Sequence, residues 1–183
     1  MKLKIWMTLG VLGLLLALAP VSQAQALNSN VANVNLNAVL AESLTVGAAP
    51  GNVNFALAAA GVANGSAPVT ITTTWVLAPT RTSVGVYGYF TSNAAALTDG
   101  TNNIPSANVS GQVNGGGFNA FTGASPFSAN ASLTILNQAI GAGNYNNSAA
   151  PASDTLDLRI DTTGLGLPAS TYTGVLHIQA QAL

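Results

Sequence analysis

The chain has 183 residues, with only four basic and five acidic side chains and no cysteine. Four basic residues are too few to form the basic patch that neutralises phosphates. The composition therefore excludes nucleic-acid binding. Low charge combined with a positive mean hydropathy also excludes a disordered chain, because disorder requires low hydrophobicity and high net charge.

Residues 1–26 have the three parts of a Sec-type signal peptide. Two lysines precede an apolar run at residues 5–19, and small residues then suit cleavage after Ala24 or Ala26. The apolar run is shorter than the roughly 20 residues that a membrane helix needs, which disfavours the alternative of a retained anchor. We expect a secreted, extracellular or cell-surface protein, with periplasmic transit in a Gram-negative cell, no later membrane span, and one domain at residues 27–183.

Short β-type segments, separated by Gly, Asn, Ser and Pro, follow the signal peptide. In chain order they lie at residues 33–40, 43–46, 52–57, 68–77, 83–90, 108–113, 118–122, 132–140, 155–161 and 171–183. Helical periodicity is hard to find after the signal peptide, because the alanine-rich stretch at residues 56–63 is cut short by glycines. About eight or nine strands with frequent turns indicate an all-β fold, a single antiparallel β-sandwich of immunoglobulin-like or Greek-key type.

Two segments alternate most clearly. In residues 68–77 one face carries Val69, Ile71, Thr73, Trp75 and Leu77. In residues 155–161 the apolar residues Leu156, Leu158 and Ile160 point inward, and Asp157, Arg159 and Asp161 point outward as a ladder of opposite charges. We expect Trp75 and Leu158 to be buried in one core. The turn at residues 78–80 predicts a hairpin between segments 68–77 and 83–90.

Side chains suited to catalysis or metal binding are scarce. The single histidine, His177, alternates away from the apolar face of its strand, which predicts an exposed residue. Gly123 to Phe127 lacks the closing glycine of a nucleophile elbow, and Glu42 stands alone. Asp154, Asp157 and Asp161 lack the spacing of a calcium loop. Residues 141–146 begin like a dinucleotide loop but lack the third glycine. We therefore predict no catalytic residue, no metal, no cofactor and no enzyme activity.

The C-terminal stretch Leu167–Ala180 resembles the end of bacterial secreted pilin-like domains, with a proline-small-Thr-Tyr-x-Gly turn before a long alternating strand. The segment Ala41–Val46 and the strand around Trp75 are similar to small secreted β-sandwiches of this kind. In chaperone–usher pilins, which this resembles, an N-terminal extension of one subunit completes the immunoglobulin-like sheet of the next. The cysteine pair often present in those pilins is missing.

The resemblance implies a strand-exchange segment formed by Val34, Leu36, Ala38 and Leu40. The alternative is that residues 33–40 form the first strand of their own domain. The predicted function is a non-catalytic structural subunit of a cell surface, a pilus-like fibre or an extracellular matrix, with copies of itself or other surface proteins as partners. The alternative function is a carbohydrate- or ligand-binding module, with Trp75, Tyr87, Tyr89 and Tyr145 as candidate stacking rings.

Overall fold

The computed structural model describes residues 26–127 and 132–183, so the predicted signal peptide lies outside the described residues except for Ala26. The chain divides into two units, residues 1–38 and 39–183, and every described strand belongs to the second. Eleven strands are described and all pair antiparallel, which confirms the predicted all-β class. Within the described ranges, no helix has the length and apolar character to cross a membrane.

The larger sheet has the order β1-β3-β10-β7-β8, with β2 also paired to β10. Its centre is the ten-residue strand β10, which pairs with β3 and then β2 along one side and with β7 along the other. The bounds are β1 Ser43–Ala49, β2 Val62–Asn64, β3 Val69–Val76, β7 Val109–Val113, β8 Phe118–Ala120 and β10 Ala152–Asp161.

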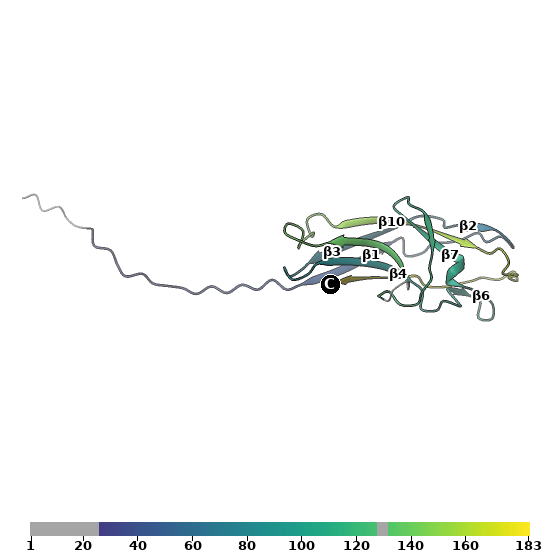
Figure 1. Cartoon of the computed structure of the whole chain (residues 1–183), viewed down its shortest axis with the longest axis horizontal. Coiled ribbons are helices and arrows are strands. Elements are labelled where there is room, and N and C mark those ends of the chain that lie inside the picture. The colour runs from purple at the N-terminus through teal and green to yellow at the C-terminus, as the bar shows by residue number, and fades with distance from the viewer. Residues whose placement is uncertain (1–25, 128–131) are drawn as a thin grey trace, which may run out of the picture. The chain divides into compact units, whose positions relative to one another are not determined.

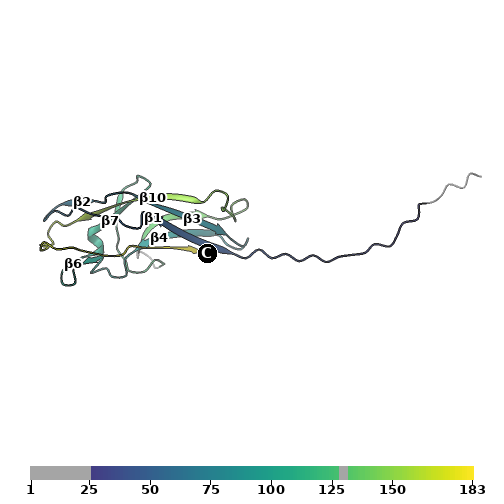
Figure 2. The ribbon, with the colours of Figure 1, turned by 180° about the vertical axis from the view of Figure 1, so that it is seen from behind.

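The smaller sheet has three strands in the order β11-β4-β9, which are His177–Ala182, Ser83–Tyr89 and Leu133–Ala139. A two-stranded hairpin, β5 Leu97–Thr98 and β6 Asn103–Ile104, precedes a short 3-10 turn at Ser106–Asn108. The C-terminus lies beside β1 in both views of the ribbon, so the edge strand of one sheet neighbours the edge strand of the other (Figures 1 and 2).

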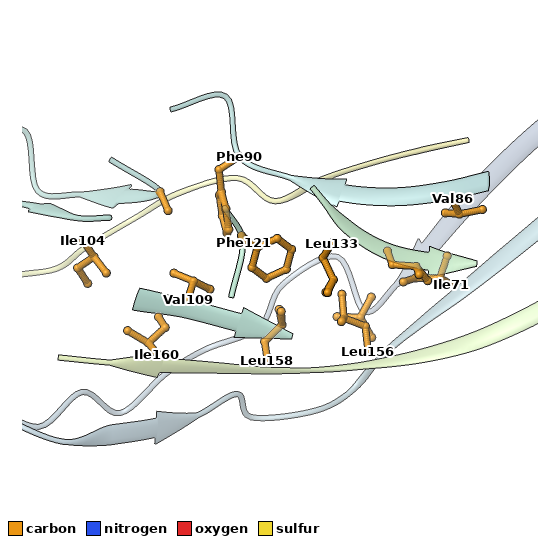
Figure 3. Close-up of a cluster of buried hydrophobic side chains, with 13 residues drawn as sticks. Ile71, Val86, Phe90, Ile104, Val109, Phe121, Leu133, Leu156, Leu158 and Ile160 are labelled. Carbon is orange, nitrogen blue, oxygen red and sulfur yellow. The ribbon is translucent and has the colours of Figure 1, made fainter. Parts of the chain in front are cut away.

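The two sheets pack face to face through a cluster of buried apolar side chains (Figure 3). The larger sheet contributes the alternating residues of β10 that were predicted to point inward, and Leu156 and Ile160 are fully buried. Val86 of the smaller sheet is also fully buried. Because burying one such side chain contributes about 1.5–3 kcal/mol, this cluster is the main source of stability in the sandwich.

A second, smaller cluster consists of Trp75, Leu77, Val84 and Ile140. Trp75 and Leu158 are 4% and 8% exposed, so their predicted burial is confirmed. The expectation that both lie in one core is wrong, because Leu158 belongs to the first cluster and Trp75 to the second. Thr73 lies between Ile71 and Trp75 on the inward face of β3, and this polar residue interrupts the apolar surface.

The predicted hairpin between segments 68–77 and 83–90 is wrong. The turn at residues 78–80 does form, with the Arg81 N–H donating to the Ala78 carbonyl at 3.0 Å. However, β3 belongs to the larger sheet and β4 to the smaller one. A local turn signal shows that the chain reverses, but it does not show whether the next strand lies beside the last or across the sandwich.

The two ends of the predicted strand series also differ from expectation. Residues 33–40 form no strand, and all of them are exposed. The predicted last strand begins at His177 rather than at residue 171. Gly174 lies directly against the backbone of Ala96, where a Cβ atom has no space, so this part of the chain contacts the region of the β5–β6 hairpin instead of extending the sheet.

Candidate functional site: open strand edges and an aromatic sheet face

The N-terminal segment, residues 26–42, carries aliphatic side chains among asparagines, and these aliphatic side chains are exposed. Its large aliphatic side chains are 79–98% exposed: Leu27, Val31, Val34, Leu36, Val39 and Leu40. Single exposed hydrophobic residues are common on protein surfaces, whereas a contiguous series usually indicates an interaction site. The predicted exchange residues Val34, Leu36, Ala38 and Leu40 alternate with other residues, so an extended backbone places all four on one face.

Strand β11 is an edge strand, because it pairs with β4 on one side only, and β1 of the larger sheet lies near its other side without being paired to it. Neither β11 nor the neighbouring edge strand β1 contains a charged residue or a proline. Native proteins commonly block sheet edges with lysine, proline or inward charges, because unpaired backbone groups accept further strands. Val46 on β1 and Ile178 on β11 are partly buried side chains that pack against the core next to this open edge.

An ion pair connects the two neighbouring edges. Arg81 Nε donates to Glu42 Oε1 at 3.1 Å, and its guanidinium also reaches the Ala182 carbonyl at 3.5 Å. Glu42 accepts a further bond from the Ala78 N–H at 2.7 Å. The Arg81 hydrogen bond and then the Ala78 N–H hold the pKa of Glu42 below its ordinary value. Glu42 is therefore not isolated, and it joins the start of β1 to the end of β11.

The loop at residues 141–151 is structural. Asn147 Oδ1 accepts from the Trp75 N–H at 2.6 Å, and Asn147 Nδ2 donates to the Thr73 carbonyl at 3.0 Å. The Trp75 indole N–H donates to the Asn144 carbonyl at 2.8 Å. These bonds attach the loop to β3, and no helix follows its glycines.

The three aspartates of the rejected calcium site occupy opposite faces of β10. Asp154 is buried on the inward face and accepts a bond from Asn114 Nδ2 at 2.7 Å, whereas Asp157 and Asp161 lie on the outer face. The predicted charge ladder forms no ion pair in the described ranges, where Glu42–Arg81 is the one salt bridge. Instead, the Arg159 guanidinium lies 4.0 Å from the centre of the Phe118 ring.

Tyr87, Tyr89 and His177 share the outer face of the smaller sheet. The register places His177 opposite Tyr89, and their ring centroids lie 5.3 Å apart at an interplanar angle of 31°. His177 is therefore half-buried against a tyrosine rather than exposed as predicted. Of the other candidate rings, Trp75 is buried in the second cluster, and Tyr145 donates its hydroxyl to the Pro79 carbonyl at 3.1 Å.

No protein-family model, curated protein or solved structure matches this chain.

Sequence patterns did not reveal two of these features. The Glu42–Arg81 pair joins residues far apart in the sequence, and neither residue lies in a motif that indicates a partner. The outer aromatic face was only partly foreseen. Alternation placed Tyr87 and Tyr89 together, but their proximity to His177 and Gln179 depends on the β4–β11 register.

Proposed function

We propose that this chain is an exported, non-catalytic structural subunit that associates with copies of itself at a cell surface, in a fibre or in an extracellular matrix. The observation that carries the proposal is the N-terminal segment, which exposes a series of aliphatic side chains and forms no strand. In this proposal, the segment from one copy adds to the open edge of β11 in another, so that its apolar face is buried.

The free energy of association requires contributions from both the aliphatic side chains and the backbone of the N-terminal segment. Burying Val34, Leu36 and Leu40 contributes together about 5–9 kcal/mol. Association itself costs about 4–15 kcal/mol in translational, rotational and ordering terms. The aliphatic side chains alone are therefore marginal, and the backbone hydrogen bonds of an added strand are needed for a stable contact. An open edge with no charge or proline supplies the partners for those bonds.

The arrangement of titratable groups supports a non-catalytic role. His177 stacks on Tyr89, and Glu42 pairs with Arg81. Asp99 accepts hydrogen bonds in a turn, where the Asn102 backbone N–H, the Asn102 side chain and the Thr101 N–H hold its pKa well below the ordinary value. In the described ranges, no group of three or more His, Asp or Glu side chains is placed to hold a metal ion.

The test compares the mature chain, residues 27–183, with two triple variants of residues 33–40. The apolar-face variant is Val34→Asn, Leu36→Asn and Leu40→Asn. The polar-face variant, Asn33→Ser, Asn35→Ser and Asn37→Ser, is the matched control, because it preserves length and leaves the aliphatic residues intact. We expect the parent and the polar-face variant to form oligomers or fibres in size-exclusion chromatography and electron microscopy, and the apolar-face variant to stay monomeric.

A deletion of residues 27–40 distinguishes exchange from pairing within one chain. Exchange predicts a folded monomer that binds a peptide of residues 33–40. A parent that is monomeric at high concentration, together with a deletion that unfolds and is not restored by the peptide, would contradict the proposal.

A further inference from the structure

The outer face of the smaller sheet combines aromatic rings with amide side chains. Antiparallel partners project to the same side of a sheet, so the β4–β11 register places Gln179 beside Tyr87, His177 beside Tyr89 and Gln181 beside Gly85. The β4–β9 register adds Thr134 opposite Tyr87. The rings are partly exposed, and they lie in a row because Tyr87 and Tyr89 are two residues apart on one strand.

The rings are held in fixed orientations. The Tyr87 ring lies over Gly85, where a Cβ atom would stand only 2.7 Å from two ring carbons. Glycine at this position therefore allows the tyrosine to lie flat on the sheet. Phe127 contacts Tyr87 edge-on, with a centroid distance of 5.8 Å and an angle of 88°. Tyr89 donates its hydroxyl to Gln179 Oε1 at 3.4 Å, which leaves the Gln179 amide N–H groups available as donors.

The face is also uncharged. None of the strands β4, β9 and β11 contains an Asp, Glu, Lys or Arg residue. An anionic ligand would lose hydration here without gaining a cationic partner, which is unfavourable. The chemistry of the face therefore matches a neutral ligand that has both apolar C–H surfaces and hydroxyl groups.

A cavity adjoins the row of rings at His177. Its volume is about 250 Å³, and its lining includes Phe90, Thr91, Thr98, Thr173, Val175 and His177. Small-molecule sites usually have volumes of about 300–1,000 Å³, so this cavity admits a single ring rather than a large ligand. His177 belongs both to the lining of this cavity and to the aromatic face, so the two sites meet at this residue.

We propose that this surface binds a neutral polysaccharide. The C–H face of each sugar ring packs on Tyr87 or Tyr89, as apolar surfaces do on aromatic rings. Sugar hydroxyls bond to the amides of Gln179 and Gln181, and the chain end enters the cavity beside His177. This inference goes beyond the proposed subunit role, because it uses the face of a sheet whereas association uses a strand edge.

The experiment measures retention of the mature chain on insoluble cellulose and insoluble β-1,3-glucan, with immobilised polygalacturonate as the anionic comparison. We expect retention on at least one neutral polymer and little on polygalacturonate. Tyr87→Leu and Tyr89→Leu should each weaken the retention about tenfold, since an aromatic contact contributes roughly one factor of ten in affinity. Phe118→Leu is the matched control, because it removes a half-buried ring from the other sheet.

Two further variants keep the result interpretable. If Tyr87→Leu fails to fold by circular dichroism, Gln181→Ala tests the same face without removing a ring. The apolar-face variant of residues 33–40 should retain polysaccharide binding, so a failure of self-association is distinguishable from a failure of sugar binding.

The proposal is overturned by no retention on either neutral polymer, by equal retention on polygalacturonate, or by unchanged retention of Tyr89→Leu. It is also overturned if Tyr89→Leu abolishes oligomers and leaves polysaccharide binding intact, because the face would then be a contact between copies of the chain.

Discussion

Two asparagine-rich regions of this chain differ in whether their backbone is held against a strand. The N-terminal segment alternates like a strand, yet it forms none and exposes its aliphatic side chains. The loop at residues 141–151 has no strand-like alternation, yet it is hydrogen-bonded along β3. Side-chain alternation therefore indicates that a segment can adopt a strand conformation. Whether the segment is fixed in place depends on unpaired backbone groups of a neighbouring strand that can form hydrogen bonds with it.

The edge of β3 explains the attachment of the loop. Strand β10 pairs with β3 from Ala152, opposite Thr73, so beyond Thr73 this side of β3 has no strand partner and pairs with the loop instead, through an isolated bridge between Val76 and Asn146. The carboxamide of Asn147 supplies one acceptor and one donor, which is what a neighbouring peptide group would supply. One asparagine side chain therefore substitutes for a residue of an absent strand.

The largest change in stability is expected from removing the Asn147 carboxamide. Asn147→Ala leaves the Trp75 N–H without its acceptor, and an unsatisfied buried backbone group costs about 1–3 kcal/mol. Chemical denaturation of monomeric protein should show that loss. The control Asn137→Ala alters an exposed asparagine on β9 and should change stability by less than about 0.5 kcal/mol. Equal stabilities for the two variants would show that the loop is not held by Asn147.

A smaller effect is expected at the junction between the N-terminal segment and the domain, where Glu42 pairs with Arg81. The pKa of Glu42 is lowered in the folded chain from its ordinary value of 4.5, so its contribution to stability is present above pH 4.5 and is lost as the pH falls through the lowered pKa. Glu42→Gln should therefore lower the thermal midpoint at neutral pH but not in strong acid. Arg81→Gln should behave in the same way, and the double variant should lose no more than either single one. A Glu42→Gln difference that persists in strong acid would contradict this assignment.

The smallest effect is expected in the N-terminal segment itself. Leu36 is 92% exposed, so Leu36→Asn should change the unfolding free energy of the monomer by less than about 0.5 kcal/mol. The measurement requires dilute protein, because association would couple stability to concentration. A loss well above that value in the monomer would show that the segment packs within its own chain.

Much of the fold was predictable where alternation and burial coincide. Strands β3 and β10 alternate over their whole lengths, and every residue that was predicted to point inward is buried, although Asp154 at the start of β10 also points inward and was not predicted to do so. Alternation failed where tertiary contacts decide the outcome. The chain after β3 crosses to the other sheet, and the approach of Gly174 to Ala96 prevents β11 from beginning at residue 171.

The candidate surfaces were less predictable than the fold. The sequence identified Val34, Leu36, Ala38 and Leu40 as a group, but it could not show whether this segment pairs within its own chain or with another copy. It also could not place His177 beside Tyr89, because the two residues are joined only by strand register. Asn147 carried no signal of its role, since a side chain that replaces a strand residue has no periodicity.

The pairing of β4 with β11 also affects how the protein folds. This ladder joins Val84 to Ala182, and the β3–β10 ladder likewise joins distant residues. Chains dominated by such contacts fold slowly, because the entropy of closing long loops must be lost before the contacts form. The smaller sheet cannot close until residues 177–182 are available. A partly synthesised chain that lacks these residues therefore has β4 and β9 without the third strand of their sheet.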